Sequence, residues 1–455
     1  MEERNGWRQM TIAECAVIND STYSPKENWP FINYLDTGNI TANRISEFQH
    51  LVVGRDKVPS RARRKCQVGD IVYSTVRPNQ RHFGILRELP DNFLASTGFA
   101  TIRAREGRAC TGFLYWFLAQ DHIVDHLHTI GEHSTSAYPS IKPSDIATLE
   151  ISLPPLDEQR AIAHVLGTLD DKIELNRRMN ETLEAMARAL FRSWFVDFEP
   201  VRAKMEGRWR PGESLPGLPA HLHPLFPDRL VPSELGDIPE GWEVRTLGDL
   251  VEVERGLSYK GSGLSPDGMP LYNLNSIYEG GGYKPEGIKH YAGDYKARHL
   301  VRPGEVVVAN TEQGHDRLLI GYAAVVPHTA TAQGLFSHHL YRVRPADESG
   351  LTPDFICALL NTPAIQGVVS GYANGTTVNM LPLDALRLPS IAVPAQALTM
   401  LFGTVAKANR ERQEQMAEQS SMLASLRTLL LPELVSGELR LPAGKALPGS
   451  EGGPE

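Results

Sequence analysis

One short stretch of this 455-residue sequence concentrates side chains that could bind phosphate groups. Residues 55–65 hold six positive charges, opposed only by Asp56. The cluster ends with Arg61, Arg63, Arg64 and Lys65. Lysine and arginine grouped in this way are typical of a surface that contacts a nucleic-acid backbone, although a solvated charged loop explains the composition equally well.

Two loops carry side chains with paired donors and acceptors, the types that read base edges in the major groove of DNA. The first loop follows a predicted strand at 70–73, and the second occupies the matching place in the other half of the chain. Candidate readers in the two loops are Arg77, Asn79, Gln80, Arg81, Asn310, Gln313, His315 and Arg317. The loops differ in sequence, as two readers of different targets would, but two unconstrained surface loops would differ as well.

Motifs of the common enzyme classes are missing from the sequence. It has no Gly-x-x-x-x-Gly-Lys-Ser/Thr phosphate loop, no Gly-x-Gly-x-x-Gly after a strand and no Asn/Asp-Pro-Pro-Phe/Tyr methyltransferase motif. The four cysteines lie far apart and form no Cys-x-x-Cys, so neither a zinc site nor a disulfide framework is indicated. His122 and His126 are four residues apart, which a polar helix face explains better than a metal site. We therefore expect a non-enzymatic chain without a metal or cofactor of its own.

The second half of the sequence repeats the first with a shift of about 235 to 242 residues. Gly6-Trp7 matches Gly241-Trp242, and Gly69-Asp70 matches Gly304-Glu305. Further matches join Ile102-Arg103 with Val343-Arg344, 113–118 with 355–360, and 143–145 with 382–384. Each match is weak alone, but their common order predicts two equivalent domains.

A long helix follows each domain, with apolar or small residues at steps of four and three, as in a coiled-coil seam. The first predicted seam is Ile162, Leu166, Leu169, Ile173, Asn176, Asn180, Leu183, Ala187, Leu190 and Trp194. The second is Leu398, Phe402, Val405, Asn409, Arg412, Met416, Gln419, Leu423, Leu426 and Leu430. Polar residues in the middle of both seams would specify register at a cost in stability. Ordinary amphipathic core helices are the alternative interpretation.

These observations predict an α+β fold with two globular mixed α/β domains, separated by a long antiparallel two-helix coiled coil and related by an internal pseudo-symmetric repeat. The expected segments are domain 1 (1–155), a spacer helix (156–198), a connector (199–240), domain 2 (241–395), a distal helix (396–437) and a disordered tail (438–455). Eight prolines in the connector predict an extended segment rather than a core.

Charge and targeting signals narrow the function classes. The formal net charge is −8, which argues against a chain that coats nucleic acid indiscriminately. Residues 1–150 hold as many positive as negative side chains, so the chain would bind DNA weakly without partners. The N-terminus lacks the layout of a signal peptide, and no apolar run approaches the length of a membrane span. A reducing cytoplasm is the expected location.

Three motifs resemble those of one known family. The stretches 151–163 and 191–201, which include Pro155-Leu156-Asp157-Glu158-Gln159 and Trp194-Phe195, resemble the central conserved region of Type I restriction–modification specificity subunits. Residues 235–242 resemble the start of the second target-recognition domain of that family. The second copy departs from the pattern, because its counterpart at 394–396 is about four residues shorter.

This resemblance implies a function for each part of the chain. Each target-recognition domain would read one half of a split double-stranded DNA site, and the helix pair would set the unread gap. The helices would dock two methyltransferase subunits, which bind S-adenosylmethionine, and two restriction/translocase subunits would join them. ATP and Mg²⁺ would belong to those partners, this chain would carry no cofactor, and no membrane partner is implied.

Two other interpretations remain at this point. The chain could be a scaffold in which the rod is the purpose and the two domains bind proteins. It could also be the specificity chain of a methyltransferase-only system or of a single-complex restriction enzyme.

Overall fold

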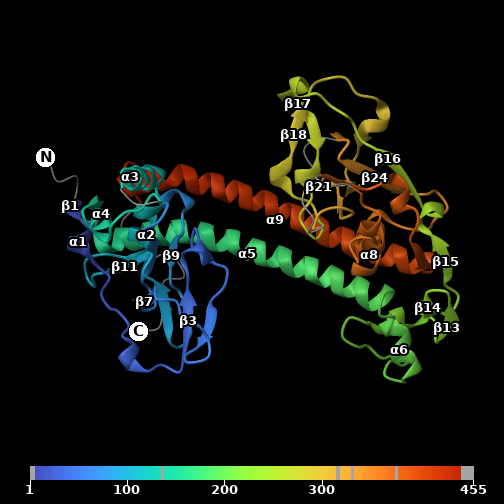
Figure 1. The fold of residues 1–455 in the computed structure, drawn as a ribbon, viewed down its shortest axis with the longest axis horizontal. Coiled ribbons are helices and arrows are strands. Elements are labelled where there is room, and N and C mark those ends of the chain that lie inside the picture. Colours follow the sequence, from blue (N-terminus) through green and yellow to red (C-terminus); the bar gives the residue numbers. More distant parts are fainter. Residues whose placement is uncertain (1–5, 135–137, 314–317, 329–332, 375–377, 442–455) are drawn as a thin grey trace. The chain divides into compact units, whose positions relative to one another are not determined.

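The computed structural model describes residues 6–134, 138–313, 318–328, 333–374 and 378–441, and it divides into two compact units. Unit 1 comprises residues 1–175 and 419–455, and unit 2 comprises residues 176–418. Figure 1 shows that each unit contains one group of strands and part of each of two long helices. In the described segments, no helix is both long and apolar enough to cross a membrane.

Unit 1 is built on two four-stranded sheets, in the orders β2-β11-β8-β9 and β6-β3-β10-β7, with β1 paired to β12 beside them. Strand β8 is fully buried, as its Ile-Val-Tyr sequence favours. The strands are β1 (Arg8–Thr11), β2 (Ala16–Ile18), β3 (Phe31–Leu35), β4 (Ile40–Thr41), β5 (Arg44–Ile45), β6 (Gln49–Val52), β7 (Ala62–Lys65), β8 (Ile71–Ser74), β9 (Phe83–Ile85), β10 (Phe93–Ser96), β11 (Phe99–Ala104) and β12 (Glu150–Leu153). The short helices are α1 (Ile12–Cys15), α2 (Thr111–Ala119), α3 (Asp121–Glu132) and α4 (Pro143–Ala147).

Unit 2 repeats this arrangement, with sheets in the orders β16-β24-β20-β22 and β18-β17-β23-β19 and a β15–β26 pair. Its strands are β13 (Leu230–Ser233), β14 (Gly236–Pro239), β15 (Glu243–Thr246), β16 (Val251–Arg255), β17 (Leu264–Tyr272), β18 (Lys289–Tyr291), β19 (Leu300–Val301), β20 (Val306–Ala309), β21 (Thr311–Gln313), β22 (Ala323–Val325), β23 (Gly334–Phe336), β24 (Leu340–Pro345), β25 (Val378–Met380) and β26 (Ser390–Val393). Its short helices are α6 (Glu199–Met205), α7 (Pro353–Leu360) and α8 (Pro363–Gly371).

The strand registers confirm the internal repeat. Ile102 pairs with Ile71 in unit 1, and the matching residues Val343 and Val306 pair in unit 2. The backbone agrees as well, because the glycine that opens each copy has a positive φ, +86° at Gly6 and +82° in the second copy. Equivalent registers and equivalent turns show two copies of one fold, as the sequence matches predict.

Two long helices, α5 (Leu156–Phe195) and α9 (Gln396–Ser436), follow the two domains. Within unit 2, Asn176 of α5 donates to the carbonyl of Met416 at 3.3 Å, and Phe191 packs on Phe402 with ring centroids 5.2 Å apart. Contacts therefore move backward along α9 as they move forward along α5. The helices are antiparallel, and the predicted helix pair is confirmed (Figure 1).

The seam on α5 has the predicted phase, but the seam on α9 is partly wrong. Ten predicted α5 positions are buried or half-buried, whereas Val405 and Leu426 are 37% and 43% exposed and Arg412 and Gln419 are also exposed. Between the correctly predicted Phe402, Asn409, Met416, Leu423 and Leu430, the inward residues are Ala406, Gln413, Ser420 and Arg427. Three of these four are polar, so the apolar pattern does not mark them, and the constant shift from the α5 seam places these positions one residue too early.

The expectation of an extended, coreless connector at 199–240 is also wrong. The segment folds into α6, a 3-10 turn and the β13–β14 hairpin, and Trp209 is only 1% exposed. Trp209, Leu222 and Phe226 join the main hydrophobic core of unit 2. Proline does not prevent this packing, because Pro200 occupies the first turn of α6, where no backbone donor is needed.

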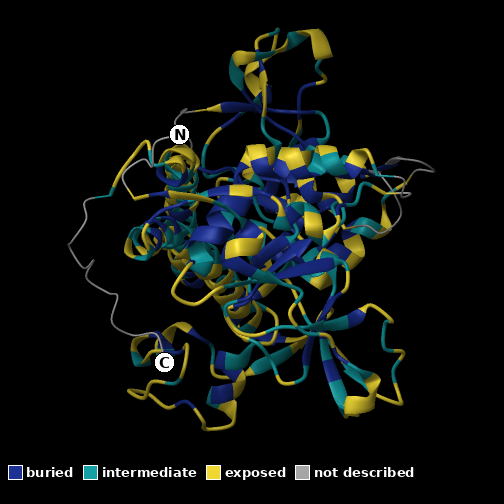
Figure 2. Cartoon of the chain, turned by 90° about the vertical axis from the view of Figure 1, so that its left-hand side faces the viewer, coloured by how far each residue is buried: buried dark blue, intermediate teal, exposed yellow. Residues whose placement is uncertain are grey.

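The core of each unit joins the domain to one end of both long helices. In unit 1 it combines α2 with Ile162 and Leu166 of α5 and with Leu434 of α9. Figure 2 shows this distribution, with buried residues on the strands and inner helix faces and exposed residues on the outer turns. The predicted tail at 438–455 lies almost entirely outside the described residues.

Candidate nucleic-acid interface

The basic cluster at 55–65 lies on and before strand β7, and its members differ in how far they are free to bind. Lys65 is paired with Glu27 and lies 5.5 Å from the ring centroid of Trp29. Arg63 donates weakly to the carbonyl of Tyr23 at 3.5 Å. Arg64 is half-buried, and burial lowers its pKa. Arg61 is exposed directly before the strand, so of the four predicted contacts Arg61 and Arg63 are the best placed to meet a phosphate.

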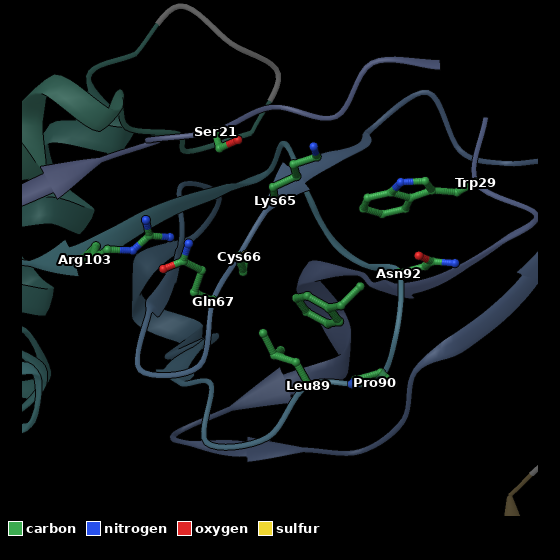
Figure 3. A pocket seen from close by; sticks show the side chains of 10 residues that line it. Ser21, Trp29, Lys65, Cys66, Gln67, Leu89, Pro90, Asn92 and Arg103 are labelled. Atoms are coloured by element: carbon green, nitrogen blue, oxygen red, sulfur yellow. The ribbon is translucent and has the colours of Figure 1, made fainter. Parts of the chain in front are cut away.

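A pocket of about 380 Å³ opens beside this strand. Figure 3 shows Trp29 and Lys65 at its rim, with Arg103 on one side and Leu89 and Pro90 below. Aromatic, apolar and positively charged groups thus face one hollow.

An ion pair supports this region in both units, and its carboxylate is buried in unit 1. Arg103 of β11 binds Asp70 through two nitrogen atoms, at 2.7 and 2.8 Å, and Asp70 is 1% exposed. At the matching positions of unit 2, Arg344 of β24 is paired with Glu305. The pair fixes the turn before β8 or β20 to the neighbouring strand, so the start of the strand that leads to each candidate reading loop is held in place.

The loop at 75–82 in unit 1 has a left-handed residue at each end of a short 3-10 turn, 78–80. Arg77 and Arg81 have φ of +47° and +54°, a conformation that costs energy for residues other than glycine. Tyr138 packs on the guanidinium of Arg77 at 4.9 Å. Arg81 donates to the carbonyl of Ala119 at 3.0 Å and pairs with Asp121, so it ties the loop to α2 and α3.

Two of the three residues between those arginines, Asn79 and Gln80, are exposed, whereas Pro78 is buried. Asn79 is exposed, and its side chain makes no hydrogen bond within the part of the chain that the structure describes. Gln80 is exposed as well, and its carbonyl lies 3.2 Å from His82 Nε2. The geometry therefore separates the four predicted readers of this loop into exposed Arg77, Asn79 and Gln80 and an anchoring Arg81.

The second loop gives a different picture. Asn310 is fully buried and donates to the carbonyl of His338 at 3.0 Å, so its amide cannot meet a base in this conformation. The backbone of Gln313 pairs with that of Val378 in the β21–β25 ladder. His315 and Arg317 lie outside the described residues. We therefore exclude Asn310 from the candidate readers, because its amide is used inside the fold.

The helix ends are fastened to the domains by tryptophan in both copies. In unit 1, Glu158 at the start of α5 accepts from Trp7 Nε1 at 3.2 Å and binds Arg440, beyond the end of α9, at 2.6 and 3.0 Å. In unit 2, Trp242 packs edge-on against Phe198, just after α5, with centroids 5.6 Å apart. Each domain thus contacts the end of the long helix that follows the other domain in the sequence.

The adjacent Gln159 explains the polar motif at the start of α5. It is 1% exposed, its carbonyl accepts from the Cys110 amide at 2.8 Å, and its amide donates to the Pro154 carbonyl at 2.8 Å. Buried polar groups of this kind need all their partners, so the motif joins helix and domain rather than serving catalysis. No group of three or more metal-ligating side chains occurs among the described residues.

Sequence reasoning missed the duplicated ion pair and the pocket next to it. Both carboxylates follow the Gly69 and Gly304 turns, and both arginines follow an Ile or Val in matched strands. Each partner could therefore be identified from the sequence as part of the internal repeat. Their pairing was not visible, because 33 residues separate Asp70 from Arg103.

Comparison with known proteins agrees with this architecture. The family model of the Type I restriction modification DNA specificity domain matches residues 5–185. The Type I restriction enzyme HindI specificity subunit of Haemophilus influenzae is 25% identical, over 95% of this chain and 99% of that protein. The MjaIX specificity subunit of Methanocaldococcus jannaschii is 26% identical, over 88% of this chain and 86% of its own length.

A solved structure shows the same fold. The Type-I restriction-modification system S subunit from M. genitalium aligns with a TM-score of 0.59 at 14% identity, covering 96% of this chain and 97% of that one. Residues 5–185 therefore match a Type I restriction modification DNA specificity domain, and nearly the whole chain is similar to Type I restriction enzyme specificity subunits.

Proposed function

We propose that this subunit reads a bipartite DNA site, with one target-recognition domain for each half-site. The duplication is the observation that supports this most strongly: two domains share strand order and register yet carry different loops at matching positions. A common frame with divergent loops suits two readers of different sequences. Protein–DNA specificity comes mainly from side chains on base edges, which such loops can supply.

In the first domain, Arg77, Asn79 and Gln80 are the proposed base readers, and Arg61 and Arg63 are the proposed phosphate contacts. The second domain would read through Gln313, His315 and Arg317. Arg81 would position the first loop rather than contact a base, because its guanidinium is occupied by α2 and α3.

The long helices are the proposed docking surface for methyltransferase subunits. They expose large apolar residues to solvent, Met179 and Met186 on α5 and Met422, Leu426 and Leu429 on α9. Met186 and Met422 occupy matching positions of the repeat, 236 residues apart. Two equivalent surfaces favour two methyltransferase subunits, with two restriction/translocase subunits joining the assembly. Exposed apolar patches of this kind mark interaction sites.

In this proposal the chain is not itself an enzyme. S-adenosylmethionine, ATP and Mg²⁺ would be bound by the partner subunits, and this chain would recognise the DNA sequence on which they act.

The test is to express the chain with its methyltransferase in a host without other methylation and to sequence the methylome. We expect one bipartite motif with a fixed gap. A chain with Asn79→Ala should change only one half of that motif, and Arg387→Gln, an exposed change outside the proposed readers, should change neither half. A continuous motif would refute the assignment of one half-site to each domain.

The scaffold interpretation makes the opposite prediction. If the domains bind proteins instead of DNA, co-expression will give no sequence-dependent methylation, although the helices will still capture partners.

A further inference from the structure

Unit 2 contains a second hollow, of about 290 Å³, whose walls carry four arginines. They are Arg298 and Arg302 before and after β19, and Arg342 and Arg344 on β24, with Glu254 and Gln333 beside them. Few protein cavities gather so many guanidinium groups, since like charges repel unless an anion lies among them.

The carboxylates nearby neutralise only part of this charge. Arg342 is paired with Glu254 and donates to the Leu300 carbonyl, and Arg344 is paired with Glu305. Arg342 also lies 3.8 Å from Glu305. Arg298 and Arg302 are exposed and have no carboxylate partner within the described residues. The four arginines thus lie near three carboxylates, Glu252, Glu254 and Glu305, and only Arg342 and Arg344 form ion pairs with them in the described structure.

Arg342 carries the strongest sign of a missing ligand. Its side chain is 4% exposed, and its Nε is buried without a hydrogen-bond partner among the described residues. Burial, and then the charge of Arg344, lower the pKa of Arg342 to about 10. A bound oxyanion would accept the unused Nε–H and would offset the repulsion between the two guanidinium groups.

The hollow occupies the same place in the repeat as the pocket of unit 1 in Figure 3. Arg344 matches Arg103, and Arg302 matches Gln67, two residues before the shared glycine turn. Arg342 matches the position of Thr101, because these two residues pair with equivalent residues of β20 and β8. The second domain therefore carries arginines at two positions where the first domain has Gln67 and Thr101.

We propose that this arginine pocket binds a phosphate group, either of the DNA backbone or of a free phosphate. The guanidinium group of arginine matches the oxygens of phosphate better than the ammonium group of lysine does, and a site with one buried and three more exposed guanidinium groups can hold a phosphate from two sides. The DNA source rests on the proposed function, whereas the oxyanion chemistry does not.

The first experiment titrates inorganic phosphate into the full chain, by calorimetry and by thermal unfolding, against chloride at matched ionic strength. Phosphate should raise the melting temperature of the wild type. Arg302→Gln should weaken phosphate binding about tenfold, the size of one lost charge-assisted hydrogen bond. Arg387→Gln, an exposed arginine of the same unit paired with Asp384, is the control and should bind as the wild type does.

Arg342→Lys keeps the charge but removes Nε, and it should weaken binding as well. If that variant does not fold, Arg302→Gln alone decides. The proposal is overturned if phosphate gives no more stabilisation than chloride, or if Arg302→Gln and Arg387→Gln bind phosphate equally.

The second experiment separates the two sources with the assembled methyltransferase on its own target duplex. If the pocket holds a backbone phosphate, Arg302→Gln will weaken binding to all sequences alike and reduce the salt slope by about one. If phosphate binding is lost while DNA affinity and slope are unchanged, the source is free phosphate. If the wild type methylated no bipartite motif, the proposed function would be refuted. The phosphate titration would still test whether the arginine pocket binds phosphate.

Discussion

Two neighbouring side chains of the 75–82 loop should respond in opposite ways to truncation. Asn79 is exposed and makes no hydrogen bond within the described structure, so Asn79→Ala should change the free energy of unfolding by less than about 0.5 kcal/mol. If Asn79 forms a bidentate contact with adenine, its loss should reduce discrimination at one base by about 1–3 kcal/mol, roughly 5- to 150-fold. The first half-site should therefore relax while the fold stays intact.

Arg81→Ala should cost stability instead. The ion pair with Asp121 contributes at most about 1 kcal/mol, because the Asp121 side chain is 80% exposed. The charged hydrogen bond to the Ala119 carbonyl contributes about 1.5–3 kcal/mol where it is shielded from water, and less here because the guanidinium is 36% exposed. Together they give an expected loss of about 1–3 kcal/mol.

The assay measures both quantities on the same variants. Urea unfolding followed by tryptophan fluorescence reports stability, since Trp116 on α2 is 5% exposed and packs on Tyr115. Methylome sequencing reports the half-site. The division of roles would be refuted if Arg81→Ala altered the motif at unchanged stability while Asn79→Ala left the motif intact.

Three further predictions concern the helices. Phe402→Ala should lower the free energy of unfolding by about 3–5 kcal/mol, because Phe402 is 1% exposed and contacts three other rings. Val405 is exposed, so Val405→Ala should lower it by less than about 1 kcal/mol. Equal losses in urea unfolding would show that Val405 belongs to the seam, as the sequence predicts. An insertion of seven residues into α5 and into α9, about two turns, should widen the gap of the methylated motif and leave both half-sites unchanged; an altered half-site would contradict this separation. Burial raises the pKa of the Asp170 carboxyl group despite its ion pair with Arg427. The folded state therefore binds the carboxyl proton more tightly than the unfolded state does. The stability that this proton contributes is lost as the pH rises above the ordinary pKa of 3.8. Asp170→Asn should then gain stability relative to the wild type over that rise, and a difference that does not vary with pH would show that Asp170 ionises normally.

The sequence predicts those elements that are determined by neighbouring residues or that occur in both copies of the repeat. Pro154 and Pro155 end a strand before α5, and the glycine turns at 69 and 304 mark equivalent places, so the duplicated domains and antiparallel helices could be derived. The phase of the α9 seam could not be derived from the sequence. Gln413 and Arg427 face inward although they are polar, so the pattern of apolar residues does not mark their positions. Long-range packing also hid the core role of Trp209 and the burial of Asn310, since neither follows from adjacent residues.

Trp7, Glu158 and Arg440 meet at one junction inside unit 1, and this junction lies near both ends of the described chain. Both ends of the described chain are fastened there, and Gly437 makes the junction possible: its φ is +78°, and a Cβ at that position would lie 3.0 Å from the Trp7 ring. The exposed turn at 210–212 is therefore a suitable place for new ends in a circularly permuted chain, because a break there leaves this junction intact.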